Sequence, residues 1–427
     1  MFNNTYLESA KCGLPAIIAT VTGRIAVDRD MTPTSGDWQR LDTSTPEAVE
    51  TVCHALASSA LAQRIDLPAD PRWIMGLVDN DSKALLLYTL GRGRLAGLAS
   101  FFVHPSALRL SLGELTFFSR PIRRLTALAP PLVDANGSEQ EEIRLLTTLL
   151  ERLHRDISPD EALFFEGVPE DTAFFRLLQA PTVRRNGFHA LRFGGLFRHR
   201  YATILGSYES SLRQLGARTR ADLRRTRKKF HAHTRNAGRI RCFRTPSDVS
   251  EFLSDSMSVS RKTYQYRLLG AGLRDRDNLE RRYRSTAALG WFRSYVLYAG
   301  KEPVAFQVGH VYGGTFHAHE IGYDPDWAKY HVGILLHTEI LMDLSGVASG
   351  VKRFDFGNDD SLHKQRLSTD SRREGYFYLI PATVRGTIMA RAMQATNKAS
   401  EELGAFLGCF GVRKRVRDVL RRLGICR

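Results

Sequence analysis

The chain has 427 residues, of which 43% are hydrophobic and 25% charged, an ordinary balance for a folded soluble protein. This length exceeds what one hydrophobic core usually supports, so we expect two domains. The 61 Lys and Arg residues outnumber the 45 Asp and Glu residues, and the net charge of +16 favours anionic partners without choosing among them.

Several protein classes are disfavoured by the same composition. Five scattered cysteines without a CxxC pair argue against a disulfide framework or a zinc site. No apolar run reaches about 18 uninterrupted residues, so no membrane-spanning helix is predicted. The first 23 residues lack the basic start and apolar core of a signal peptide. We therefore expect a soluble, cytoplasmic protein.

Residues 1–195 are predicted to form a mixed α/β domain. Helical periodicity is found at Pro46–Gln63 and, more strongly, at Glu139–Arg155. Apolar runs of strand length lie at Ala16–Val27, Trp73–Val78, Ala84–Leu90, Leu95–Val103 and Ala162–Val168.

A boundary near Gly194–Gly206 separates this domain from a second one at 196–385. Three helical patterns come first, at Tyr208–Phe230, Pro246–Tyr266 and Asn278–Leu289. Strands, one helix and further strands follow, at Trp291–Tyr298, Pro303–Val311, Thr315–Tyr323, Val332–Leu344 (the helix), Arg353–Phe356 and Gly375–Ile380. Residues 386–427 are predicted to be a basic helical tail.

A polar loop joins the strand Thr315–Tyr323 to the helix that opens at Val332-Gly333. The free N–H groups and the dipole of a helix start both favour an anion, so this loop is a candidate phosphate site. Gly333 lacks a Cβ, and the backbone there can approach a phosphate closely. The candidate binding residues are Tyr330, His331, Val332, Gly333 and Ile334. The alternative is a plain glycine at a helix start.

The short strand Phe354-Asp355-Phe356 is followed by Gly357 and a charged loop that carries His363 and Lys364. In a strand, Asp355 points away from both phenylalanine rings. The carboxylate is a candidate for acceptor binding or proton transfer, and Lys364 for holding a phosphate or an oxyanion. The alternative for Asp355 is a carboxylate that satisfies local backbone donors, and for Lys364 a solvated loop lysine.

Histidines gather on the two strands before the loop. His317 and His319 share one face by alternation, and Glu320 is expected on the opposite face. His319, Glu320 and Asp355 are all candidate general bases. No third ligand is placed by the sequence and HExxH is absent, so no metal is expected.

The order of strand, loop, helix and strand from Gly313 to Arg366 resembles the second half of a GNAT-type acyltransferase. The Gly333 position matches the GNAT pyrophosphate loop at one residue, and Tyr330, Gly333, Leu335 and Leu336 resemble the BioF2-like/CelD branch, relatives of the FemAB ligases. The spacing of Asp355, Gly357 and Lys364 fits that branch, although His363 stands where an aromatic residue, often Tyr, is usual. The resemblance extends over about 200–385 and is weaker over 1–195.

This resemblance implies an α/β fold of tandem GNAT-like lobes, with mixed sheets flanked by helices, and an N-acyltransferase activity. The enzyme would move an acyl group from acetyl-CoA or another acyl-CoA to an amine acceptor, in a context of polysaccharide or cell-envelope biosynthesis. Glu320 or His319 would act as base, His363 would replace the usual acid, and Asp355 and Lys364 would line the acceptor side.

Twelve basic residues between Arg213 and Arg244 are opposed only by Asp222, and the tail turns basic again at Arg413-Lys414-Arg415. The interpretations left open are a solvated helix face or a footprint for RNA, a phosphorylated precursor or a membrane surface. Two alternatives to the acyl-CoA enzyme follow. One is a Fem-like transferase that uses aminoacyl-tRNA, and the other is a non-catalytic binding protein with a degenerate GNAT fold.

Overall fold

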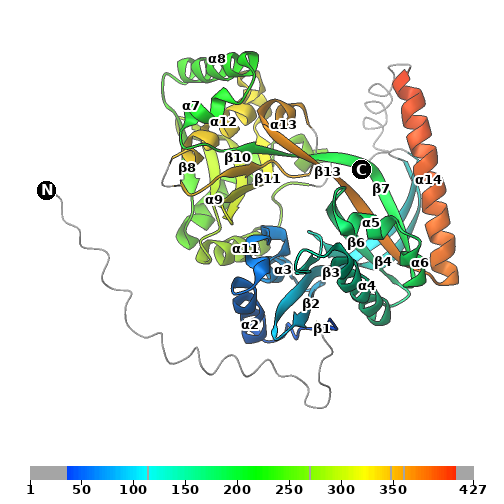
Figure 1. Cartoon of the computed structure of the whole chain (residues 1–427). Coiled ribbons are helices and arrows are strands. Elements are labelled where there is room, and N and C mark those ends of the chain that lie inside the picture. The colour runs from blue at the N-terminus through cyan, green and yellow to red at the C-terminus, as the bar shows by residue number, and fades with distance from the viewer. Residues whose placement is uncertain (1–35, 113–114, 269–270, 347–348, 359–360, 410–427) are drawn as a thin grey trace, which may run out of the picture.

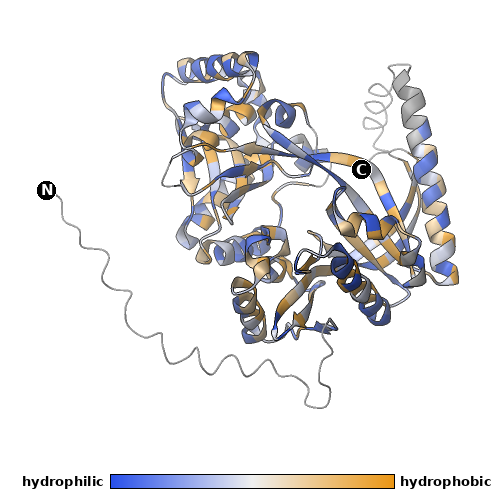
Figure 2. Cartoon of the chain, in the orientation of Figure 1, coloured by the Kyte–Doolittle hydropathy of each residue, from blue (hydrophilic) through white to orange (hydrophobic). Residues whose placement is uncertain are grey.

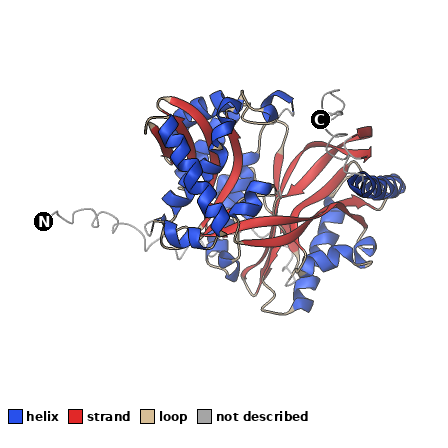
Figure 3. Cartoon of the chain, turned by 90° about the horizontal axis from the view of Figure 1, so that it is seen from above, coloured by secondary structure: helices blue, strands red, loops and turns tan. Residues whose placement is uncertain are grey.

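The computed structural model describes residues 36–112, 115–268, 271–346, 349–358 and 361–409. Within these residues, strands form one mixed sheet that runs through the whole molecule, with helices packed on its faces (Figures 1 and 3). The order of strands along the sheet is β1-β2-β3-β4-β6-β13-β7-β12-β11-β10-β9-β8, and β5 pairs with β3 beside this path. The expected α/β fold is confirmed.

The N-terminal half begins the sheet and is built from short and long strands with helices between them. Its elements are β1 (Trp38–Arg40), α2 (Pro46–Ala57), η1 (Ala60–Gln63), η2 (Leu67–Ala69), α3 (Pro71–Leu77), β2 (Lys83–Gly91), β3 (Arg94–Leu112), β4 (Leu115–Ala127), β5 (Leu132–Val133), α4 (Glu139–Asp156), β6 (Glu161–Pro169), α5 (Ala173–Gln179), α6 (Thr182–Arg185) and β7 (Phe188–Thr203).

The C-terminal half continues the sheet and ends in a long helix. Its elements are α7 (Tyr208–Arg213), α8 (Ala217–His233), β8 (Gly238–Phe243), η3 (Pro246–Asp248), α9 (Val249–Ser260), α10 (Tyr264–Leu268), α11 (Arg276–Ala288), β9 (Ser294–Ala299), β10 (Glu302–Tyr312), β11 (Thr315–Tyr323), η4 (Pro325–Tyr330), α12 (Val332–Leu344), β12 (Arg353–Asp355), α13 (Leu362–Leu367), β13 (Asp370–Pro381) and α14 (Val384–Cys409).

The two halves repeat one arrangement of elements. In each, a strand and helices are followed by three antiparallel strands, a helix, and a strand parallel to the third of the three. The parallel pairs are β4 with β6 and β11 with β12. The strand order β1-β2-β3-β4-β6 therefore corresponds to β8-β9-β10-β11-β12.

The last strands of the halves are exchanged between them. β7, which follows the N-terminal half in the chain, pairs with β12 of the C-terminal half. β13, which follows the C-terminal half, pairs with β6 of the N-terminal half, and β7 and β13 pair with each other. Because of this exchange, the sheet is continuous across the middle of the molecule.

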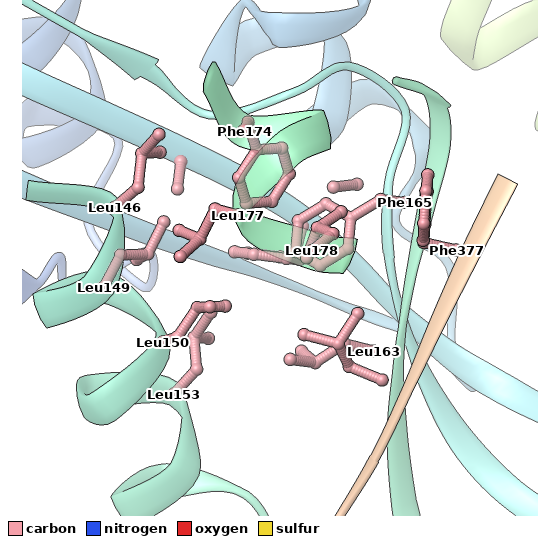
Figure 4. Close-up of a cluster of buried hydrophobic side chains, with 14 of the residues drawn as sticks. Leu146, Leu149, Leu150, Leu153, Leu163, Phe165, Phe174, Leu177, Leu178 and Phe377 are labelled. Carbon is pink, nitrogen blue, oxygen red and sulfur yellow. The ribbon is translucent and has the colours of Figure 1, made fainter. Parts of the chain in front are cut away.

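Each half has its own hydrophobic core. In the N-terminal half, α4 and α5 pack leucine and phenylalanine side chains on the sheet, and Phe377 from β13 joins them (Figure 4). In the C-terminal half, α8 and α12 cover one face of the sheet, where Phe316 and Phe354 lie. Helices α9 and α11 cover the other face around Phe252 and Phe306.

The structure corrects some sequence-based predictions and leaves others open. Of Trp73–Val78, predicted as a strand, all but Val78 belong to α3, because the Asp70 side chain caps the helix and Pro71 begins it. The helix predicted at Tyr208–Phe230 is interrupted at Gly216 and forms α7 and α8. The predicted strand Ala16–Val27 and the end of the basic tail, 410–427, lie outside the described residues. None of the described helices combines the length and apolar character needed to cross a bilayer.

Phe377 tests the contribution of the exchanged strand. Its ring is 1% exposed and packs edge to face on Phe175, with centroids 5.2 Å apart. Replacement by Ala leaves a cavity in the N-terminal core, and we expect Phe377→Ala to lower the free energy of unfolding by about 3–5 kcal/mol in urea titrations. Phe117→Ala is the matched control, because that ring is 65% exposed and its loss should cost little. Equal effects of the two variants would contradict the structural role of β13.

Candidate active site between the two halves

The register of the central strands brings polar side chains to one face of the sheet. His317 on β11 lies opposite Asp355 on β12, and Asp355 lies opposite Tyr201 on β7. Residues directly opposite one another in a sheet project from the same face. His199, two residues before Tyr201, shares that face, and so does Glu374 of β13, whose side chain reaches His199. Four strands therefore deliver one polar cluster.

The imidazole of His199 bridges two buried carboxylates. Its Nε2 lies 2.5 Å from Oδ1 of Asp355, and its Nδ1 lies 3.0 Å from Oε2 of Glu374. The N–H of Gly357 donates a second hydrogen bond to Asp355 Oδ1 at 2.7 Å. The Tyr201 ring stacks on the imidazole at 4.6 Å between centroids. The four side chains of this cluster all lie on strands, so the pairing of these strands fixes the geometry of the cluster.

A second histidine approaches Asp355 from the opposite side. His317 Nδ1 lies 3.5 Å from Asp355 Oδ2, and its Nε2 lies 3.0 Å from Oδ1 of Asp66 in the N-terminal half. The Nε2 contact is close enough for an ion pair, but its direction is not that of a hydrogen bond. Asp66, His317 and Asp355 offer three ligand atoms within 4.8 Å of one another, a spacing that a metal ion can use. The expectation of no metal stays a prediction.

The charges of the cluster are mutually stabilised. Burial opposes the charged forms of His199 and His317, but the neighbouring carboxylates outweigh it and raise the pKa of each ring to about 9. Burial likewise opposes ionisation of Asp355, yet the two histidines hold its pKa well below the usual range. At neutral pH the cluster therefore contains two imidazolium rings and their carboxylate partners. A protonated His317 also disfavours a metal, which binds neutral imidazole.

A cavity of about 360 Å³ opens beside this cluster, between the two halves of the chain. The N-terminal half contributes one wall, which includes Asp66, Trp73 and Glu166. The C-terminal half contributes the other, which includes Arg282 of α11 and His319 of β11. The Trp73 indole stacks on His319 at 5.1 Å between centroids. The helix that was predicted as a strand is thus the element that carries this indole to the cavity.

The cavity reaches the point where β11 and β12 separate. Their pairing ends at His317 and Asp355, and β11 continues to Tyr323. Ala318 and His319 line the cavity from one strand, and Gly357 lines it from the residues after the other. A reacting group that enters this split from the opposite face of the sheet would therefore meet a molecule bound in the cavity.

The structure corrects the expected placement of Glu320. The pairing of β10 with β11 shifts register between Gln307 and Gly309, so one residue of β10 faces an extra residue of β11 there. Strict alternation fails at this bulge, and both His319 and Glu320 turn toward the α11 side. His319 contacts Trp73, and the Glu320 carboxylate approaches Gly272 in the loop before α11. Of the two, only His319 is among the cavity-lining residues.

The environments of these two candidate bases shift their pKa values in opposite directions. His319 is accessible from the cavity, yet the surrounding protein and the charges of His317 and Arg282 lower its pKa. Burial raises the pKa of the half-buried Glu320 carboxyl. His319 is therefore neutral at pH 7, and no hydrogen bond from the described residues occupies its ring nitrogens.

The start of α12 lies on the other face of the sheet. His331 adopts a left-handed conformation (φ 51°, ψ 42°) just before the helix, and no side chain caps it. Val332 and Tyr330 pack in the core, so only their backbone groups are candidates for ligand binding. A pocket of about 230 Å³ adjoins this start, lined by His331 and Ile334 with Arg225 and Lys229 of α8 and Arg366 of α13.

His363 and Lys364 lie on the same side of the sheet as α12. The His363 ring stacks on the buried His337 of α12 at 5.6 Å, and the Lys364 charge lowers the pKa of His337 in addition to burial. The alternation Phe354-Asp355-Phe356 sends the two rings to this side and the carboxylate to the cavity. The structure therefore brings Asp355 and His319 together, and it does not bring Lys364 to Asp355.

Several groups at the cavity were not found from the sequence. Asp66 and His199 lie more than 100 residues before Asp355 in the chain. Glu374 lies on β13, whose neighbouring strands are set by the exchange. The sequence did contain one local signal, the pattern His199-x-Tyr201. These two polar residues alternate along a strand, but the segment lies at the predicted domain boundary.

Comparison with known proteins finds one family match and several similar folds. Residues 217–365 match the acetyltransferase (GNAT) domain family. The crystal structure of FemX aligns with a TM-score of 0.51 and 12% identity, over 76% of this chain and 94% of that one. At this identity the likeness shows the fold alone.

Two further solved structures align at lower scores. They are the C-terminal domain of a putative lysylphosphatidylglycerol synthetase from Agrobacterium fabrum (TM-score 0.47, 15% identity, 82% of this chain and 95% of that one) and a tandem GNAT protein from the clavulanic acid biosynthesis pathway (0.43, 13%, 81% and 98%). A search of curated proteins by sequence finds no match.

The charge on His199 makes the stability of the fold depend on pH. Its folded pKa of about 9 exceeds the unfolded value of about 6.5, so its contribution is complete below about pH 6.5 and is lost as the pH rises through about 9. We expect His199→Gln to cost about 3–5 kcal/mol at pH 6, because two buried carboxylates lose their cation. The penalty relative to the wild type should shrink at pH 10.

Urea unfolding of both proteins at the two pH values measures this penalty. His54→Gln, at an exposed position of α2, is the control and should show no such difference. A His199→Gln penalty that is equal at pH 6 and pH 10 would mean that the ring is not charged.

Proposed function

We propose that this chain, which carries a GNAT-superfamily acetyltransferase domain in a fold shared with FemX, transfers an acyl group from acyl-CoA to an amine. One observation carries the proposal. The split between β11 and β12 adjoins a polar cavity that contains carboxylates on one side, and a basic pocket lies at a helix start on the other. Two substrates can thus approach one point from opposite faces of the sheet.

The donor site of the proposal is the pocket at the start of α12. The first N–H groups of this helix, at Val332, Gly333 and Ile334, have no helical partner and no side-chain cap, and the helix dipole favours an anion there. Arg225, Lys229 and Arg366 line the same space, and although Arg225 and Arg366 pair with Asp222, a net positive charge remains there. These groups suit the pyrophosphate of CoA, with the acyl chain directed along the split.

The acceptor amine would occupy the cavity, where Asp66, Glu166 and Asp355 attract an ammonium group. In the reaction, the amine nitrogen forms a C–N bond to the thioester carbonyl carbon and the C–S bond breaks. The ammonium first loses one proton to a base so that the free amine can attack, and the nitrogen loses a second proton as the C–S bond breaks. The departing sulfur takes up one of these protons to give free CoA, and the other leaves to solvent. Direct transfer of this kind needs both substrates to be bound at once.

His319 is our choice for the base. The choice rests on position, because the ring is neutral at pH 7, is open to the cavity and lies at the split, although burial lowers its pKa to about 3 and makes it a weaker base than a free imidazole. Glu320 follows it in the bulge, and its raised pKa also suits a base, but it is not among the cavity-lining residues. Asp355 is held as a carboxylate by two imidazolium rings, which makes it a weak base and a good anchor for His199 and His317.

A second donor is favoured by a specific observation. Helix α8 carries a row of exposed basic side chains at the surface of the C-terminal half, seen as a blue helix at the top of Figure 2. Such a surface suits the phosphate backbone of a tRNA. An aminoacyl-tRNA donor would keep the acceptor cavity and replace acyl-CoA. A non-catalytic protein with this fold would bind neither donor productively.

Gly333 tests the donor site. A Cβ at this position would meet Tyr323 at 3.5 Å and Ile321 at 3.9 Å, both ordinary contact distances, so the protein itself tolerates a side chain there. We expect Gly333→Glu to abolish the binding of acetyl-CoA and of a longer acyl-CoA, because its carboxylate repels the pyrophosphate. Gly333→Ala should weaken binding at most modestly.

Isothermal titration of the three proteins measures the difference. No binding of either thioester to the wild type would overturn the CoA donor, and titration with aminoacyl-tRNA would then decide between the two alternatives.

His319→Gln tests the base. General-base catalysis typically contributes 10²–10⁴-fold, so kcat should fall by about that factor while the binding of acyl-CoA is unchanged. Because the pKa of His319 is lowered, the wild-type rate should not show the protonation of an ordinary imidazole near pH 6.5. The pH profile of kcat, measured by thiol release, checks this. A larger loss in Glu320→Gln than in His319→Gln would move the role to the carboxylate.

A further inference from the structure

The cavity contains two opposite charges that do not neutralise each other. Arg282 of α11 lines it from the C-terminal half, and Glu166 of β6, just after the pairing of β6 with β4 ends, lines it from the N-terminal half. Among the described residues, neither side chain takes part in an ion pair or a hydrogen bond. Each would gain from a ligand of the opposite charge, because a charge that leaves water without a partner is costly.

Arg282 is held in place without a carboxylate. Its guanidinium lies over the Trp73 ring at 4.5 Å from the centroid, a cation–π contact that fixes the plane of the group. Its Nε is fully buried and has no hydrogen-bond acceptor within the described part of the chain. Burial lowers the pKa of this guanidinium, and the nearby Tyr283 opposes that shift only in part.

Arg372, the other arginine that lines the cavity, has its guanidinium paired within the protein. Arg372 donates from Nε to Oε1 of Glu374 at 2.7 Å, and its Nη2 lies 2.6 Å from the same oxygen. That charge is used within the protein, whereas the charge of Arg282 is available. A guanidinium binds a carboxylate or a phosphate through two parallel N–H groups, so an oxyanion is its natural ligand.

Glu166 contributes negative charge to the wall that the N-terminal half forms. Burial raises the pKa of its carboxyl, and the charge of Arg124 offsets part of that rise. Arg124 itself donates to Thr126 and Tyr378 and leaves the carboxylate without a direct partner. Asp66, 42% exposed at its side chain, lies on the same half of the cavity. The two walls therefore differ in charge, and a ligand that carries both signs fits in one orientation.

We propose that the acceptor is a zwitterionic small molecule whose carboxylate or phosphate binds Arg282, while its ammonium group lies toward Glu166 and Asp66. This inference rests on the proposed function, since it names the class of amine that the cavity accepts. A cavity of about 360 Å³ lies at the lower end of small-molecule sites, which suits an amino acid or an amino sugar phosphate. Arg282 is thus a specificity-determining residue.

Matched pairs of amines test the proposal by direct binding. Ethanolamine is compared with phosphoethanolamine, glucosamine with glucosamine 6-phosphate, and propylamine with β-alanine, so that each pair differs in the oxyanion. Isothermal titration of the wild type should give at least tenfold tighter binding for the oxyanion-bearing member of one or more pairs. The phosphate and carboxylate pairs separate the two sources of the anion.

Arg282→Gln should reduce that preference to about onefold, and Arg282→Lys should restore part of it. Arg284→Gln is the control, because Arg284 lies on the same helix in an exposed ion pair with Glu280 and should keep the full preference. A preference that survives in Arg282→Gln, equal binding within every pair, or binding of no probe would overturn the proposal. Thermal unfolding of each variant confirms that the fold is intact.

A parallel titration with acetyl-CoA keeps the two proposals apart. Oxyanion-dependent amine binding without acetyl-CoA binding would retain the Arg282 site and remove the CoA donor. Acetyl-CoA binding without a preference for oxyanion-bearing amines would retain the CoA donor and remove the Arg282 site.

Discussion

The structure depends on one buried cation, on β7, to which two other strands must supply counter-charges. The His199 ring stands on β7, Asp355 on β12 and Glu374 on β13, and each carboxylate lies within 3.0 Å of a ring nitrogen. An imidazolium and two carboxylates can be buried together only if all three are in place. Since β7 follows the N-terminal half in the chain and β13 follows the C-terminal half, this cluster requires the exchange of strands. Folding of either half alone would leave a charge without its partner.

The same exchange explains why the cavity belongs to neither half. Glu166 lies on β6, which pairs with β13, and Arg282 lies on α11, which packs against the C-terminal sheet. The halves also contact each other directly, because Tyr312 of β10 donates to Asp70 at 2.9 Å and Arg281 of α11 donates to the Val78 carbonyl at 3.1 Å. The binding surface therefore depends on how the halves are held together, and the sheet holds them through paired strands rather than a flexible linker.

Local patterns in the sequence predicted those features that depend on neighbours in the chain. Alternation in Phe354-Asp355-Phe356 correctly separated the carboxylate from the two rings, and the helix at Val332–Leu344 has its predicted bounds. The bulge that turns Glu320 could not be predicted, because it arises from a mismatch between β10 and β11. The role of His199 was not predicted for a similar reason, since its partners lie 156 and 175 residues further along the chain.

The pair Gly194-Gly195 has a structural role that the sequence pattern alone did not reveal. Two glycines between apolar runs are typical of a linker, and a domain boundary is predicted near them, at Gly194–Gly206. In the structure both have positive φ, 74° and 75°, and they form an insertion in β7 where Tyr376 pairs with Phe193 and Gly375 pairs with Leu196. Residues with a Cβ are strained at such angles, so glycine is required here by the backbone. The strand before the insertion carries Leu191 into contact with the N-terminal half, and the strand after it carries His199 to Asp355. A flexible dipeptide thus lets one strand serve both halves, which is the condition for a shared cavity.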